Sequence, residues 1–148
     1  MSNKIYPIGI QNFEKIRKGG YCYIDKTAWI YQMVKTGSYY FLSRPRRFGK
    51  SLLLSTLEAY FQGKKKLFEG LAIEKLEKDW IKYPILHLDL NAEKYTTPEA
   101  LDQVLESALR GWEALYGAQD YEKTFASRFQ GIIQRACEKE GQSVVILV

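Results

Sequence analysis

The stretch that most constrains this chain is residues 39–54, which read YYFLSRPRRFGKSLLL. An aromatic, β-favouring run at 39–42 precedes a basic turn, and Gly49-Lys50-Ser51 then opens an apolar helix. A phosphate-binding loop has this setting of strand, loop and helix, because the loop amides and the positive end of the helix face the phosphates. The sequence therefore predicts a nucleotide phosphate site.

Residues of this loop have distinct expected roles in binding Mg-ATP. Lys50 is the catalytic candidate because its ammonium group would reach the β- and γ-phosphates, while the Ser51 hydroxyl would ligate Mg²⁺. Backbone N–H groups and arginine side chains complete the expected nucleotide site, which comprises Arg44, Arg46, Arg47, Phe48, Gly49, Lys50, Ser51 and Leu52. Catalysis at such a site rests on positioning and charge stabilisation, without a covalent protein intermediate.

The loop departs from the signature G-x-x-x-x-G-K-[ST] at its first position, where Arg44 replaces glycine. Glycine permits a backbone angle there that arginine disfavours. Two interpretations of Arg44 stay open: it holds a strained backbone angle, or its guanidinium group contacts phosphate or a neighbouring acid. For the whole stretch, the alternative to a phosphate site is a basic surface turn.

Three segments carry a family resemblance: residues 23–27 (YIDKT), 41–51 (FLSRPRRFGKS) and 67–73 (LFEGLAI). Together they resemble the predicted AAA-ATPase-like family of bacterial P-loop proteins, which often carry a restriction-endonuclease-like domain near the C-terminus. Members share the arginine-rich loop, so Arg44 looks like the family's own version. The resemblance implies ATP and Mg²⁺ as cofactors, and a C-terminal nuclease-like domain as a partner within the parent chain.

The segment at 23–27 lies upstream of the loop, where related ATPases place adenine contacts. The resemblance thus makes Tyr23 and Asp25 candidate nucleotide-binding residues. The alternative is that Asp25 simply caps the following helix. Both interpretations stay open at the level of sequence.

Apolar periodicity predicts alternating strands and helices. Strands are expected at 39–42, 85–90 and 143–148, and helices at 25–35, 50–62, 97–116 and 120–140, with Thr97 and Asp120 as N-caps of the last two. The crossovers are long enough for parallel pairing, so the expected fold class is α/β, a three-layer P-loop NTPase-like parallel sheet. We expect residues 1–38 to form an entry segment and helix, and residues 39–148 the N-terminal part of a P-loop ATPase domain.

The last expected strand, 143–148, is apolar throughout. In the resembling family such a strand leads into an acidic pair, which helps to hold Mg²⁺ and polarises the attacking water. These acids would begin at position 149, so we expect a sheet that is incomplete at the C-terminus and belongs to a larger ATPase. Asp89 is a rival metal-side acid, and its alternative role is to cap a loop.

The chain carries a net charge of +5, which is compatible with nucleic acid as a partner but does not establish it. It shows no signal-peptide pattern and no apolar run that could span a bilayer, so we expect a cytoplasmic protein without a membrane partner. The leading hypothesis is an ATP-binding P-loop module of an AAA-like ATPase, which hydrolyses ATP in the full-length parent. The alternative is a non-hydrolytic nucleotide-binding regulatory module that presents a basic face to nucleic acid or a partner domain.

Overall fold

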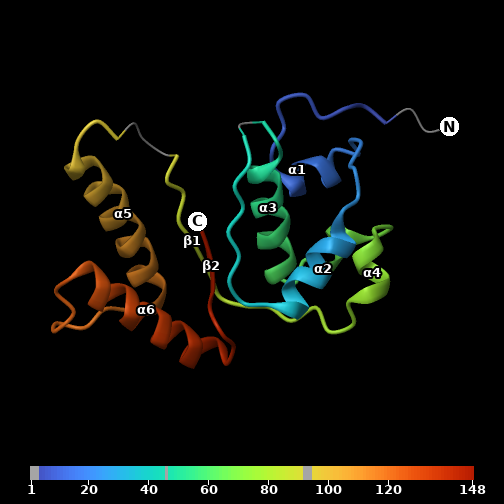
Figure 1. Cartoon of the computed structure of the whole chain (residues 1–148). Coiled ribbons are helices and arrows are strands. Elements are labelled where there is room, and N and C mark those ends of the chain that lie inside the picture. Colours follow the sequence, from blue (N-terminus) through green and yellow to red (C-terminus); the bar gives the residue numbers. More distant parts are fainter. Residues whose placement is uncertain (1–3, 46, 92–94) are drawn as a thin grey trace. The chain divides into compact units, whose positions relative to one another are not determined.

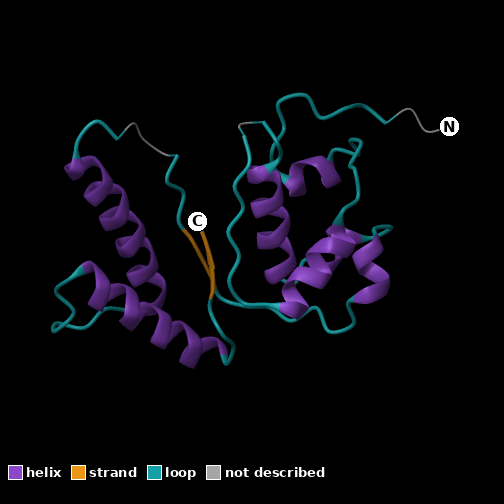
Figure 2. Cartoon of the chain, in the orientation of Figure 1, coloured by secondary structure: helices purple, strands orange, loops and turns teal. Residues whose placement is uncertain are grey.

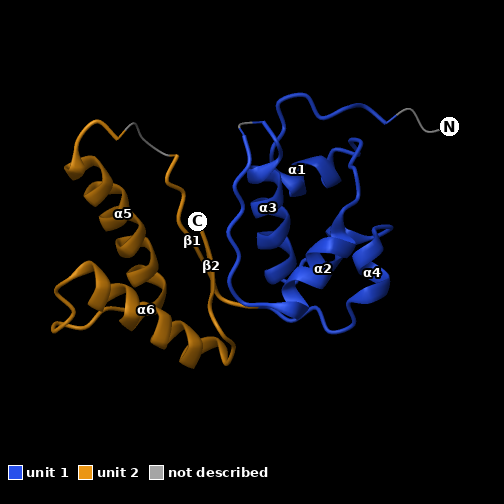
Figure 3. Ribbon diagram, viewed as in Figure 1, with its two compact units in different colours: residues 1–82 blue, residues 83–148 orange. Residues whose placement is uncertain are grey.

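The structure is a computed structural model that describes residues 4–45, 47–91 and 95–148. Its internal contacts form two compact units, residues 1–82 and 83–148 (Figure 3). This division by internal contacts falls after residue 82. The expected division into an entry segment and helix, residues 1–38, and part of a P-loop ATPase domain, residues 39–148, stays a prediction.

Unit 1 is a group of short helices with no strand among its described residues (Figures 1 and 2). They are α1 (Phe13–Lys18), α2 (Thr27–Thr36), α3 (Lys50–Phe61), the 3-10 helix η1 (Lys65–Phe68) and α4 (Ala72–Leu76). Phe13, Phe68 and Ile73 are completely buried among them, and the Phe13 and Phe68 rings lie 4.8 Å apart. Helices this short depend on such packing, because isolated helices of fewer than about 12 residues are marginal in water.

The strand expected at 39–42 is not formed, so that prediction was wrong. Tyr39 and Phe41 are 97% and 93% exposed, and the Tyr40 hydroxyl instead donates to the Met33 carbonyl at the end of α2, at 2.6 Å. A strand needs neighbouring strands to satisfy its backbone groups and cover its side chains. The sheet formed by the described residues contains β1 and β2 alone.

Unit 2 combines two strands, β1 (Ile85–His87) and β2 (Val145–Leu147), with two long helices, α5 (Pro98–Tyr116) and α6 (Phe125–Glu140). The strands pair in parallel, with Leu86 opposite Ile146. Leu86, Leu109 and Ile132 form the buried core between β1, α5 and α6. Mixed α/β structure and parallel pairing are therefore confirmed, whereas the described residues form a two-stranded sheet and not the expected three-layer one.

Helix boundaries in unit 2 follow local capping signals. Thr97 is the N-cap of α5 and Pro98 its first residue, as predicted. Asp120 was wrongly predicted to cap α6: Thr124 does so, and its hydroxyl accepts a hydrogen bond from the Ser127 amide at 3.1 Å. Ser127 returns a bond by accepting from the Thr124 amide at 3.0 Å. This reciprocal capping box satisfies two helix-end donors, which an Asp120 cap would leave unpaired.

Ion pairs join α6 to α5 and to the loop between the two helices. Arg128 of α6 reaches Glu106 at 2.5 Å and Glu113 at 2.6 Å, and its hydrogen bond to Glu113 holds the pKa of that carboxyl below its usual range. Arg135 pairs with the buried Glu122 at 2.6 Å. Gly131 gives this second pair its space, because a Cβ at that position would collide with the Glu122 carboxylate.

Candidate phosphate-binding site

The phosphate loop, which we define as residues 43–49, leads directly into α3. Gly49 is the N-cap of this helix with a left-handed φ of 79°, and the first intrahelical bond runs from the Leu53 amide to the Gly49 carbonyl at 2.9 Å. The amides of Lys50, Ser51 and Leu52 precede that bond, so the helix itself offers them no acceptor. Free amides and the helix dipole together favour an anion at this end of α3.

The side chain of Lys50 folds back over the loop. Its ammonium group donates to the carbonyl oxygen of Arg44 at 2.6 Å, which links the two ends of the loop. Both residues are exposed. The structure therefore places a cation beside the free amides at the start of α3, and the lysine is not part of a core.

Arg44 does not have the strained backbone that a lost glycine would suggest. Among the described residues other than glycine, positive φ angles occur at Arg47, with 67°, and at Trp80. The left-handed turn of the loop is thus made by Arg47 and Gly49, and the first position has no need of glycine. Arg44 and Arg47 are exposed, and neither forms an ion pair within the described part of the chain. Arg46 lies outside the described residues.

The remaining loop candidates lie in the same turn of structure. Phe48 is exposed, Ser51 is exposed in the first turn of α3, and Leu52 is partly buried. The Ser51 hydroxyl is the side-chain oxygen here that could ligate Mg²⁺. The described residues hold no cluster of three or more His, Cys, Asp or Glu side chains suited to a metal ion.

Asp25 makes contacts within unit 1. Its Oδ1 accepts hydrogen bonds from the amide and hydroxyl of Thr27 at 2.9 and 2.6 Å, and its Oδ2 accepts from the Ala72 amide at 2.7 Å. Burial raises the pKa of Asp25, but these bonds outweigh it, so the pKa lies below its usual value. Asp25 therefore bonds to Thr27, the first residue of α2, and ties this helix to the start of α4, although the N-cap of α2 is Lys26 and not Asp25. Its nucleotide contact stays a prediction.

Tyr23, the other upstream candidate, also packs on the protein's own core. Its ring meets that of Phe13 edge-on, with the centroids 5.1 Å apart, and burial raises the pKa of its hydroxyl. Among the described residues, no hydrogen bond connects Tyr23 or Asp25 to the arginines of the phosphate loop. The contact of Tyr23 with nucleotide likewise stays a prediction.

In unit 2, the Asp89 Oδ1 accepts a hydrogen bond from the Asn91 amide at 2.9 Å. This bond corresponds to the loop-capping role, which was the alternative to a role as a metal ligand.

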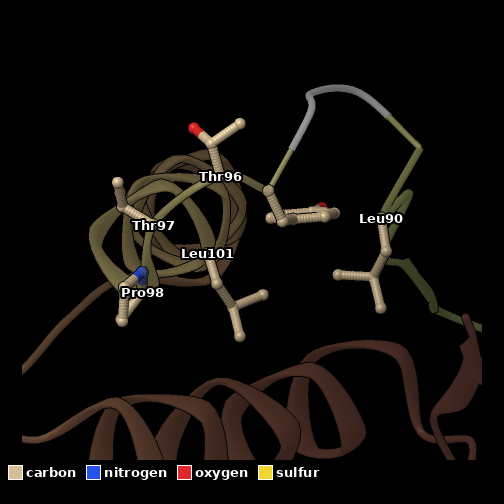
Figure 4. Close-up of a pocket in the computed structure, with 6 residues that line it drawn as sticks. Leu90, Thr96, Thr97, Pro98 and Leu101 are labelled. Atoms are coloured by element: carbon tan, nitrogen blue, oxygen red, sulfur yellow. The ribbon is translucent and has the colours of Figure 1, made fainter.

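A pocket of about 520 Å³ lies at the start of α5 (Figure 4). Its lining is mostly apolar: Leu90, Tyr95, Thr96, Thr97, Pro98 and Leu101. The sequence marked this place solely as a helix start, and none of the predicted site residues lines the pocket.

None of the described helices combines the length and the apolar character needed to cross a membrane.

Comparisons with known proteins place the chain in a family. No solved structure matches the chain. It is 39% identical over 150 residues to an uncharacterized protein in the vnfD 5′ region of Azotobacter chroococcum, and it spans 29% of that protein's length. The model of the family described as "Predicted AAA-ATPase" matches residues 7–148. Since this match covers nearly the whole sequence, the chain belongs to the predicted AAA-ATPase family.

Proposed function

We propose that this chain is the ATP-binding P-loop module of an AAA-like ATPase, which hydrolyses ATP in the whole protein. The observation that carries the proposal is the Lys50 ammonium group, held over the loop by the Arg44 carbonyl at 2.6 Å beside the free N-terminus of α3. The proposal includes the three-layer parallel P-loop sheet that the family resemblance implies for the whole protein. The chain spans 29% of the length of its relative. ATP hydrolysis is therefore proposed for the whole protein and not for this chain alone.

Each residue of the loop has a physical task in this proposal. Lys50 would exchange the Arg44 carbonyl for the β- and γ-phosphate oxygens, which carry a full negative charge and are better acceptors for an ammonium group. The amides at the start of α3 would donate to the phosphates. Mg²⁺, bound through Ser51, would neutralise charge on the phosphates. Arg44 and Arg47 would add positive charge close to the same anion.

The test is Lys50→Ala in the whole protein, with Mg-ATP binding measured by isothermal titration calorimetry. We expect loss of most of the affinity and an unchanged melting temperature, because Lys50 is exposed. Lys66→Ala is the matched control, since it removes the same charge from another exposed position of unit 1. A collapse of the melting temperature in Lys50→Ala would show that the lysine is structural and would contradict the site.

A second candidate is the non-hydrolytic nucleotide-binding module that presents a basic face to nucleic acid or a partner domain, such as a nuclease-like domain of the parent chain. It is favoured by the exposure of Arg44 and Arg47, because one nucleotide does not need both arginines in addition to Lys50. Phosphate release separates the two functions. Turnover that depends on Lys50 supports the ATPase, and Lys50-dependent binding without turnover supports the regulatory module.

A further inference from the structure

The two compact units carry opposite charge. Residues 1–82 contain 16 Lys and Arg side chains against 7 Asp and Glu, whereas residues 83–148 contain 6 against 10. Four of the positive charges of unit 1 lie at residues 44–50, in the phosphate loop and at the start of α3. A positive surplus therefore remains in unit 1 outside the loop, and a surplus confined to one part of a chain indicates a polyanionic partner.

Much of this surplus lies where α1 meets η1. The segments 14–18 and 64–69 contain six Lys and Arg side chains against two Glu. Arg17 holds the two helices side by side, because its guanidinium group donates to the carbonyl oxygens of Leu67 at 2.7 Å and of Glu69 at 2.6 Å. Both acceptors are uncharged, so these bonds do not neutralise the arginine.

Glu14 brings two of the lysines together. Its Oε1 lies 2.7 Å from the Lys18 Nζ, and its Oε2 lies 2.8 Å from the Lys64 Nζ. These two bonds lower the pKa of Glu14 to about 2, so the carboxylate stays ionised. One carboxylate therefore orders two ammonium groups and leaves the pair with a net positive charge. Lys82 lies next to this pair in space, since a Cβ on Gly63 would come within 3.8 Å of the Lys82 Cα.

The lysine face, as we name it, consists of six side chains: Lys15, Lys18, Lys64, Lys65, Lys66 and Lys82. All of them except Lys64 are exposed. Apart from Lys18 and Lys64, they form no ion pair within the described part of the chain. Lysines in solvent add little to folding, so their ammonium groups are available to an external anion.

The lysine face is separate from the phosphate loop. The loop enters α3 at its N-terminal end, whereas the lysines at 64–66 follow its C-terminal end. The 12 residues of α3 put about 18 Å between these two ends. The face is therefore a second set of positive charges and not an extension of the proposed nucleotide site.

The helices that carry the face keep their apolar side chains inside the protein. Phe13 and Ile16 of α1 are buried, and so is Phe68 of η1. A helix that lies on a membrane instead inserts apolar side chains between the lipids while its lysines face the headgroups. The lysine face thus suits a hydrophilic polyanion better than a lipid surface.

We propose that the lysine face binds the phosphate backbone of duplex nucleic acid without regard to base sequence. A duplex carries one negative charge per about 1.7 Å of its axis, so several ammonium groups on one face can each meet a phosphate. Phosphate contacts position a duplex but carry no sequence information. The inference goes beyond the proposed function, because it depends neither on Lys50 nor on a bound nucleotide.

The test is fluorescence anisotropy of the whole protein, without nucleotide, with labelled duplex DNA and duplex RNA of arbitrary sequence. The double variant Lys65→Ala/Lys66→Ala should bind about tenfold more weakly at physiological salt, and its slope of log affinity against log salt should fall by about two, because two phosphate contacts are lost. Lys26→Ala/Lys75→Ala is the matched control, since it removes two exposed lysines from the same unit. It should leave both affinities unchanged.

The double variant should keep the melting temperature and the Mg-ATP affinity of the unaltered protein, because both lysines are exposed. Binding of either duplex that depends on Lys65 and Lys66 supports the inference, and the two labelled duplexes show whether DNA or RNA is preferred. An equal loss in the control overturns it, because net charge and not this face would then bind the duplex.

Three further results would also overturn the inference. In the first, the whole protein binds neither duplex. In the second, Lys50→Ala abolishes duplex binding and Lys65→Ala/Lys66→Ala does not, which would put the duplex at the phosphate loop. In the third, the same lysines bind vesicles of anionic phospholipid and no duplex. The proposed function is judged separately in every case, by whether Mg-ATP binding depends on Lys50.

Discussion

In the α5–α6 hairpin, the Arg128 side chain is 15% exposed and bonded to Glu106 and Glu113, whereas Arg44 and Arg47 of the phosphate loop are exposed and form no ion pair with described residues. Apolar side chains differ in the same way. Leu109 and Ile132 are buried in the hairpin, and the residues that lead into the loop are exposed. In the hairpin, charged groups bond to one another and apolar groups pack against one another. In the loop, the same kinds of group remain accessible to a ligand.

This contrast separates stability from binding. A guanidinium group that is bonded within the protein resists removal, because its loss leaves carboxylates desolvated without a cation. A guanidinium group in solvent adds little to folding and can form charge-assisted bonds to phosphate when a ligand arrives. Substitutions in the hairpin should therefore change stability, and those in the loop should change affinity.

The largest change in the free energy of unfolding is expected from Arg128→Met in the hairpin. It leaves Glu106 and Glu113 without their shared cation, so we expect the free energy of unfolding to fall by about 2–3 kcal/mol. Urea unfolding measures it. Arg110→Met is the matched control: its side chain is 75% exposed and pairs with Glu106 at 2.7 Å, which is worth at most about 0.5 kcal/mol. If both variants lowered the free energy of unfolding equally, burial would not explain the contribution of Arg128 to stability.

Two glycines in the interiors of the hairpin helices sharpen the comparison. Gly131→Ala should destabilise by about 2 kcal/mol, since the new Cβ would displace the buried Glu122 from Arg135. Gly111→Ala should instead stabilise by about 0.5–1 kcal/mol, because a Cβ there meets no atom within 4 Å and alanine is the better helix former. Thermal unfolding of both variants gives the two signs. A gain in Gly131→Ala would show that the Glu122 pair contributes no stability.

In the loop, two arginine variants should differ, one in stability and the other in affinity. Arg47→Gly should stabilise by roughly 1 kcal/mol, because it relieves a left-handed φ of 67°. Arg44→Gly should leave the melting temperature no higher and should weaken Mg-ATP binding at least tenfold in the whole protein, through loss of a charge-assisted bond. A raised melting temperature with unchanged affinity in Arg44→Gly would show that Arg44 is merely tolerated.

The sequence was most informative where the signal acts within one turn of chain. Thr97-Pro98 predicted the start of α5, Gly49-Lys50-Ser51 predicted the start of α3, and the helices expected to end at residues 116 and 140 end there, as α5 and α6. Each of these depends on the capping groups and backbone angles of a few neighbouring residues. Asp120 failed as a cap because Thr124 and Ser127 satisfy each other, a choice between two local signals that propensity alone does not rank.

Tertiary structure decided the features that need partners distant in sequence. The aromatic run at 39–42 favours a strand, but a strand forms solely where another strand offers its backbone groups, and Tyr40 bonds to α2 instead. Asp25 could cap or bind, and the Ala72 amide, 47 residues away, ties it to α4. Sequence thus predicted α2, α3, α5 and α6 and the loop that leads into α3, because their signals are local, whereas α1 and α4 were not predicted. Pairing across the chain determined which charges are bonded inside the protein and which remain accessible to a ligand.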